Sequence, residues 1–157
     1  MLRYLKGYWN YIGKVRFNFL KSHECENLII HCSDYRFQKA MNQLRESFEI
    51  SPDDEIKIPG GVKSIVERND LVLGWIKLLI DGHGIKKILL VNHANCAAYN
   101  SFASEEEEEA FHQKQLLLAE AVIRKMYPDI QICRCYLRSS KNHKWIELLE
   151  SITEFAA

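Results

Sequence analysis

Two short segments of the chain carry residue types that can hold a metal ion. The first contains Cys32, Asp34 and Arg36 in a Cys-x-Asp-x-Arg spacing, and the second contains His93 and Cys96 in a His-x-x-Cys spacing. Thiolate and imidazole groups are ligands that zinc accepts readily in tetrahedral geometry. Three such ligands leave the fourth position for water or for a nearby carboxylate. The two segments together therefore predict a Zn²⁺ site.

Asp34 and Arg36 are spaced to form an ion pair beside that site. An arginine two residues from a carboxylate can hold it in a bidentate contact. Such a contact keeps Asp34 off the metal and directs it toward metal-bound water, whereas its loss would let Asp34 become the fourth ligand of a closed site. We therefore predict that Asp34 and Arg36 are catalytic and that Asp34 is a ligand only in a closed state.

The segments follow stretches with the pattern of buried strands. Short apolar runs predict strands, and apolar residues at helical spacing predict helices. The expected strands cover 27–32, 55–58, 87–92 and 130–137, and the expected helices cover 35–48, 62–81, 104–126 and 145–152. This alternation predicts one α/β domain with a mostly parallel central sheet of about four strands flanked by helices. Because such sheets bind ligands outside the carboxyl ends of their strands, both segments are expected to meet there.

The paired segments resemble the hallmark of the β-class carbonic anhydrases, in which Cys-x-Asp-x-Arg is followed, after a helix and a strand, by His-x-x-Cys. The resemblance covers roughly residues 27–99 in motif and order. It implies that Cys32, His93 and Cys96 bind zinc and that Asp34 and Arg36 form the catalytic dyad. It further implies reversible hydration of carbon dioxide to bicarbonate by a zinc-bound hydroxide. Some relatives hydrolyse carbonyl sulfide or carbon disulfide instead.

Three departures from the family pattern mark this chain as a compact, divergent relative. Tyr35 replaces the usual serine, and residues 58–61 read Ile-Pro-Gly-Gly where an Arg-Asn-Ala-Gly-like loop is usual. The family's Asp-Cys-Gly is here Asn95-Cys96-Ala97. These changes leave a second class of function open, a non-catalytic zinc-binding protein with a structural or interaction role on the same scaffold.

Other residues of the same types are expected to have structural roles. A single cysteine at a strand end is more often a small apolar residue than a ligand. We interpret three cysteines in this way: Cys25, Cys133 and Cys135. Four histidines are expected to be solvated: His23, His83, His112 and His143. The backbone amides of Gly60-Gly61 could approach a ligand closely, but such a pair more often forms only a turn, and a turn is expected here. The acidic run 105–109 is expected to be the solvated start of a helix capped by Ser104.

Composition narrows the function classes further. The 157 residues suit one domain. Because 21 Lys and Arg balance 21 Asp and Glu, the protein has no net charge that would attract nucleic acid or an anionic membrane surface. No run reaches the ~18 apolar residues of a membrane span. Five cysteines, an odd number without an export signal, argue against a disulfide framework. We therefore expect a cytoplasmic protein.

The first 22 residues form a segment of distinct composition. Five basic residues and no acidic one occur between 1 and 21, interleaved with aromatic residues. An amphipathic helix on a membrane or nucleic acid has this pattern. In β-class relatives, however, N-terminal helices embrace a partner subunit, and the active site lies at the dimer interface. The expected organisation is a helical dimerisation arm over 1–22 and a zinc-binding domain over 23–157. The expected partners are a small-molecule substrate (carbon dioxide or bicarbonate) and a second copy in a homodimer or larger homo-oligomer, without nucleic acid or stable membrane insertion.

Overall fold

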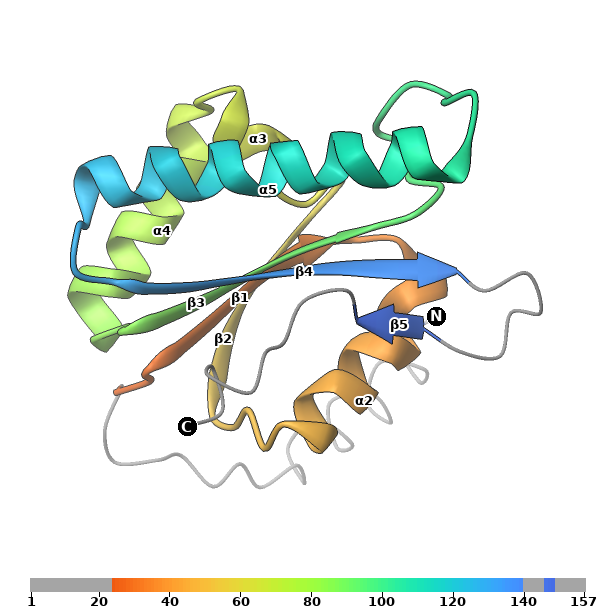
Figure 1. Ribbon diagram of the computed structural model, residues 1–157. Coiled ribbons are helices and arrows are strands. Elements are labelled where there is room, and N and C mark those ends of the chain that lie inside the picture. The colour runs from red at the N-terminus through yellow and green to blue at the C-terminus, as the bar shows by residue number, and fades with distance from the viewer. Residues whose placement is uncertain (1–23, 140–145, 149–157) are drawn as a thin grey trace, which may run out of the picture.

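The computed structural model describes residues 24–139 and 146–148, which build one central sheet. Its five strands lie in the order β2-β1-β3-β4-β5 (Figure 1). Their bounds are Asn27–Cys32 for β1, Asp53–Ile58 for β2, Lys87–His93 for β3, Gln131–Ser139 for β4 and Ile146–Leu148 for β5. The first four strands are parallel, and β5 runs antiparallel to β4. The predicted α/β domain with a mostly parallel sheet is thus confirmed, whereas the predicted arm over 1–22 lies outside the described residues.

Helices cover both faces of this sheet. They are the short 3-10 helix η1 (Tyr35–Phe37), α2 (Gln38–Ser47), α3 (Lys63–Val66), α4 (Asp70–His83) and α5 (Glu105–Met126). In Figure 1, α2 lies on one face, and α3, α4 and α5 lie on the other. Successive side chains of β1 point to opposite faces of the sheet. Ile29 belongs to the core beneath α2, while Leu28 and Ile30 belong to the core beneath the other helices. Burial on both faces explains why the strands are continuous apolar runs.

The strand order reverses between β1 and β3. From β1 the chain passes through α2 to β2 on one side, and from β2 it crosses to β3 on the opposite side of β1. Parallel pairing sets Asn27 opposite Lys87 and Ile30 opposite Leu90, so the carboxyl ends of both strands lie at one edge. This edge is the topological switch point where open α/β sheets bind ligands.

Two of the predicted helices are wrong. The helix expected over 62–81 is split into α3 and α4, because Arg68 has a φ of 54° and Asn69 caps α4 by accepting a hydrogen bond from the Val72 N–H at 3.2 Å. Within the helix expected over 145–152, residues 146–148 instead form β5 and pair with β4, and 149–152 lie outside the described residues. Pairing with the open edge of β4 outweighs the local helical pattern there.

None of the helices in the described part of the chain combines the length and apolar character that crossing a membrane requires.

Candidate metal centre

The fold brings three of the predicted site residues together. Cys32 is the last residue of β1, His93 is the last residue of β3, and Cys96 follows in the next loop. Their ligand atoms all lie within 4.8 Å of one another, and the two sulfur atoms are 3.8 Å apart. All three residues are buried. Adjacent parallel strands therefore place two thiols and one imidazole around a common point.

His93 presents one ring nitrogen to this point. Its Nδ1 donates a hydrogen bond to the Ala94 carbonyl at 2.8 Å, which leaves Nε2 with a free lone pair. Nε2 is buried and has no hydrogen-bond partner among the described residues. Phe37 stacks on the ring with centroids 4.0 Å apart and so limits its rotation. Since buried polar atoms normally have partners, an orphaned nitrogen beside two sulfurs fits a metal ligand.

The pKa values of the two thiols are shifted in opposite directions. The Cys96 thiol and the Gly60 N–H, which lies 3.3 Å from Cys32 Sγ, both donate to the Cys32 sulfur. The bond from Cys96 is the largest cause that lowers the pKa of Cys32, and the same contact raises the pKa of Cys96. The contact between the two sulfurs therefore favours ionisation of Cys32 over ionisation of Cys96. Binding of a cation by both sulfurs requires both thiols to lose their protons.

Asp34 and Arg36 form the ion pair expected from their spacing. Arg36 Nε lies 3.0 Å from both carboxylate oxygens of Asp34, and Nη2 lies 2.5 Å from Oδ2. Hydrogen bonds from Arg36 lower the pKa of Asp34 to about 2. Arg36 Nη2 also donates to the Asn95 carbonyl at 2.8 Å, which ties the pair to the loop before Cys96. Asp34 is not part of the cluster formed by Cys32, His93 and Cys96. Its carboxylate is hydrogen-bonded to Arg36 instead.

Gly60 and Gly61 do more than form the expected turn. Gly60 has a φ of 79°, and its N–H donates to Cys32 Sγ. Gly61 has a φ of 55°, and a Cβ placed there would lie 2.9 Å from the Val91 carbonyl oxygen and from Asn92 Oδ1. The interpretation as a simple turn is therefore wrong, because only glycine lets this backbone approach the site. Two glycines directly after a strand at the ligand-binding edge were the available signal.

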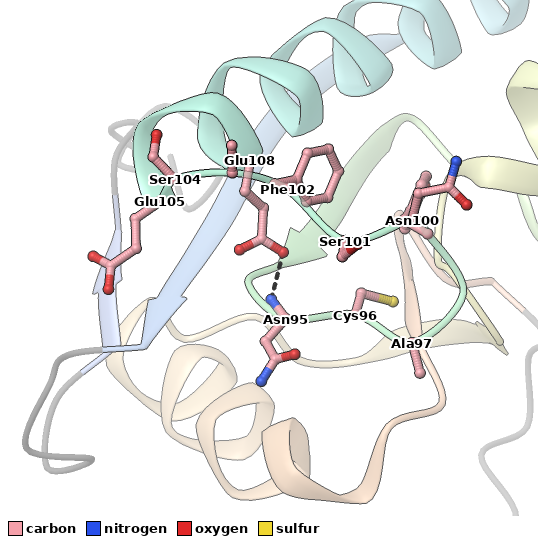
Figure 2. A pocket seen from close by; sticks show the side chains of 11 residues that line it. Asn95, Cys96, Ala97, Asn100, Ser101, Phe102, Ser104, Glu105 and Glu108 are labelled. Carbon is pink, nitrogen blue, oxygen red and sulfur yellow. Dashed lines mark hydrogen bonds between the residues drawn. The ribbon is translucent and has the colours of Figure 1, made fainter.

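His112 and Glu108 are the other residues whose importance sequence reasoning missed. His112 is fully buried, so its prediction as solvated is wrong, and its Nδ1 accepts a hydrogen bond from Asn92 Nδ2 at 3.1 Å. Glu108 Oε1 accepts from the Asn95 N–H at 2.6 Å (Figure 2). His112 occupies the helical spacing of the buried residues of α5, which are His112, Leu116, Ala119 and Ile123. This periodicity could have identified it.

The other predictions for single residues have mixed outcomes. His83 is half-buried and its Nδ1 lies 2.6 Å from Asp54 Oδ2, whereas His23 and His143 lie outside the described residues. Cys25 and Cys135 are buried, as expected, and Cys133 is partly buried. Ser104 caps α5 by accepting from the Glu107 N–H at 3.2 Å, which confirms the predicted cap.

A cavity opens beside Cys96. It has a volume of about 510 Å³ and is bounded by the 95–105 segment and the first turn of α5. Figure 2 shows Cys96 and Asn95 on one side of it and Phe102, Glu105 and Glu108 on the other. Of the three clustered residues, Cys96 lines this cavity, whereas Cys32 and His93 do not.

The buried His112 is expected to make folding stability depend on pH. Burial lowers its pKa from 6.5 to about 4, so between these values the unfolded chain binds more protons than the folded one. Stability from this group is complete above pH 6.5 and is lost as the pH falls toward 4, by up to about 3 kcal/mol. The titratable groups facing it are Glu108, Tyr99, Tyr136 and His93.

Chemical denaturation of the wild type and of His112→Phe across this pH range measures the effect. The difference between their unfolding free energies should change with pH, with the wild type losing more stability in acid. Parallel pH curves for the two proteins would show that His112 does not titrate as its burial predicts.

Comparison with known proteins places these features in context. Residues 22–147 match the model of a family described as "Putative carbonic anhydrase". The structure is similar to the crystal structure of carbonic anhydrase from Streptococcus mutans, with a TM-score of 0.60 and 13% identity, over 94% of this chain and 96% of that one. It is also similar to a β-carbonic anhydrase of Trichomonas vaginalis, with a TM-score of 0.59 and 12% identity, over 94% of each chain. At these identities the likeness shows a common fold.

Two relatives by sequence come from Rickettsia. A Rickettsia bellii protein named only "Uncharacterized protein" is 27% identical over 123 residues, covering 69% of this chain and 74% of that protein. A similarly named protein of Rickettsia conorii is 25% identical over 123 residues, covering 69% of this chain and 65% of that protein. Neither name states an activity.

Proposed function

This chain belongs to the family described as "Putative carbonic anhydrase", and from that premise we propose that it binds zinc and reversibly hydrates carbon dioxide to bicarbonate. The observation that carries the proposal is the cluster of Cys32, His93 and Cys96 at the switch point of a β-carbonic anhydrase-like fold. The adjacent Asp34–Arg36 pair supplies the charged groups that the reaction needs.

The donor set suits zinc. Cys32 Sγ, Cys96 Sγ and His93 Nε2 would hold the ion, since the two sulfurs lie 3.8 Å apart and the buried nitrogen has no hydrogen-bond partner among the described residues. Zinc bound by these groups supplies a Lewis acid that makes water a stronger nucleophile. The three ligand groups are buried, and Phe37 covers one face of the His93 ring. These side chains therefore shield the ligands from bulk water.

Asp34 would orient the attacking water. Its carboxylate remains ionised because Arg36 holds its pKa at about 2, so an oxygen can accept a hydrogen from that water. Arg36 spans Asp34 and the Asn95 carbonyl, and this contact fixes the carboxylate relative to the loop that bears Cys96. Arg36 thus acts by holding Asp34 in place.

Stopped-flow hydration of carbon dioxide by protein of verified zinc content tests this proposal. Zinc-loaded protein should accelerate hydration, and removal of zinc with a chelator should abolish the acceleration. Zinc-loaded protein without activity toward carbon dioxide would contradict the proposal. The same preparation, assayed with carbonyl sulfide and carbon disulfide, distinguishes a related hydrolase from a non-catalytic zinc protein.

We propose further that the 1–22 segment is a dimerisation arm and that the protein acts in the cytoplasm. The first statement is supported by the resemblance to β-class carbonic anhydrases, in which N-terminal helices embrace a partner subunit. The second is supported by the cysteines: all five lie in the described residues, and none forms a disulfide.

Removing residues 1–21 is expected to convert a dimer into a monomer, because the arm would supply the contacts with the partner subunit. Light scattering of the full chain and the truncated chain at matched concentrations measures this change. A truncated protein that remains dimeric would exclude the arm as the dimerisation element.

A further inference from the structure

Two asparagines flank His93 at the end of β3, and each contacts one side chain of α5. Asn92 contacts His112, and Asn95 contacts Glu108. Glu108 and His112 lie four residues apart and therefore on the same face of the helix. One face of α5 thus contacts the metal-binding segment on both sides of His93.

The first contact fixes the orientation of the Asn92 amide. The Val62 N–H can only donate, so it faces Asn92 Oδ1, 3.4 Å away, and leaves Nδ2 to donate to His112 Nδ1 at 3.1 Å. Burial keeps His112 neutral by lowering its pKa to about 4, so Nδ1 is available as an acceptor. Asn92 is itself buried. Its amide therefore has one satisfied arrangement, with His112 on one side and the 60–62 turn on the other.

The 60–62 turn also contacts Cys32, one of the proposed metal ligands. Gly60 donates its N–H to Cys32 Sγ at 3.3 Å and accepts from the Tyr99 hydroxyl at 2.9 Å. Asn92 holds the same turn through Val62. A displaced Asn92 would therefore move the N–H that stabilises the Cys32 thiolate.

The second contact, between Asn95 and Glu108, lies directly before Cys96 in the chain. The Asn95 N–H donates to Glu108 Oε1 at 2.6 Å, and the Asn95 carbonyl accepts from Arg36 Nη2 at 2.8 Å. Asn95 has a φ of 54°, a left-handed conformation that costs energy in a non-glycine residue. Hydrogen bonds on both sides of the residue offset that cost. Because Cys96 is the next residue, they also set the position of its sulfur.

We propose that Glu108 and His112 are positioning residues that hold Cys32, His93 and Cys96 in the geometry for metal binding. This inference rests on the proposed zinc function and deepens it, since it assigns α5 a part in building the site. Groups that hydrogen-bond a ligand directly typically contribute roughly 10- to 100-fold to metal affinity. Glu108 and His112 act instead through Asn95, Asn92 and the 60–62 turn, so a smaller contribution is expected from each.

Titration with Co²⁺ tests the proposal, because the absorption of a cobalt–thiolate site reports both affinity and geometry without an activity assay. Glu108→Leu and His112→Phe remove the two acceptors and preserve much of the side-chain volume. Each is expected to weaken Co²⁺ binding by up to roughly 10-fold, the lower end of the range for direct partners of a ligand, and to change the spectrum at saturation. Glu108→Gln keeps an oxygen acceptor for the Asn95 N–H and should restore the wild-type spectrum.

His83→Phe is the matched control for His112→Phe. It removes the last residue of α4, a histidine that pairs with Asp54 of β2 and is not part of the metal cluster. This variant should leave Co²⁺ affinity and the spectrum unchanged. Thermal unfolding without metal identifies variants that fail to fold. If His112→Phe does not fold, the Glu108→Leu and Glu108→Gln pair decides, since the Glu108 side chain is 15% exposed on the first turns of α5.

The outcomes separate this inference from the function on which it rests. Folded Glu108→Leu and His112→Phe proteins with wild-type Co²⁺ affinity and spectrum would overturn the positioning role. Equal losses in His83→Phe would also overturn it, since they would show an effect of stability alone. A wild-type protein that binds neither Co²⁺ nor Zn²⁺ would refute the proposed zinc function itself, and the inference with it.

Discussion

Exchange of Cys96 for serine is expected to abolish stoichiometric zinc binding and, with it, carbon dioxide hydration. A serine hydroxyl does not ionise near neutral pH, so the substitution removes one of two thiolate ligands and the negative charge that balances the cation. We expect the loss of zinc affinity to exceed the roughly 100-fold upper range for outer partners of a metal site. Elemental analysis of purified protein and competition with a chromogenic chelator measure the effect.

Cys25→Ser provides the control for this exchange. Cys25 is also buried, and its sulfur donates to the Asn27 carbonyl at 3.3 Å, a bond that a serine hydroxyl can replace. This variant should retain stoichiometric zinc. Unchanged zinc content in Cys96→Ser would contradict the assignment of Cys96 as a ligand, and the Cys32 and His93 assignments would then need the same test.

Replacing Asp34 with asparagine is expected to leave zinc bound but to reduce kcat for carbon dioxide hydration by about 100-fold or more. The amide has nearly the same shape, but it lacks the charge and the second acceptor oxygen with which the carboxylate would orient water. Since the Asp34 carboxylate stays with Arg36 and outside the described ligand cluster, metal affinity should change little. Parallel measurement of zinc content and stopped-flow rates separates the two effects.

Asp54→Asn offers a matched comparison for that variant, because Asp54 lies in β2, pairs with His83 of α4 and is not part of the cluster. It should retain both zinc and activity. Full activity in Asp34→Asn would remove Asp34 from the mechanism, whereas loss of zinc in Asp34→Asn alone would make it a ligand.

The sequence by itself determined which strand ends carry metal-binding groups. Apolar runs located the four parallel strands, and the helices between them required parallel crossovers, so Cys32 and His93 had to reach the same edge of the sheet. The Asp34–Arg36 pair also followed from spacing, since only Tyr35 separates its members. These features depend on local periodicity and on short distances along the chain, which is why they could be read without coordinates.

The tertiary structure alone decided how those groups are held. Residues far apart in the chain meet there: the Gly60 N–H reaches Cys32, and α5 brings Glu108 and His112 to the two asparagines beside His93. Likewise, the edge of β4 makes a strand of 146–148 where the local pattern favoured a helix. Each outcome depends on hydrogen-bond partners supplied by another element, and the free energy of a buried polar group depends on whether such a partner is present.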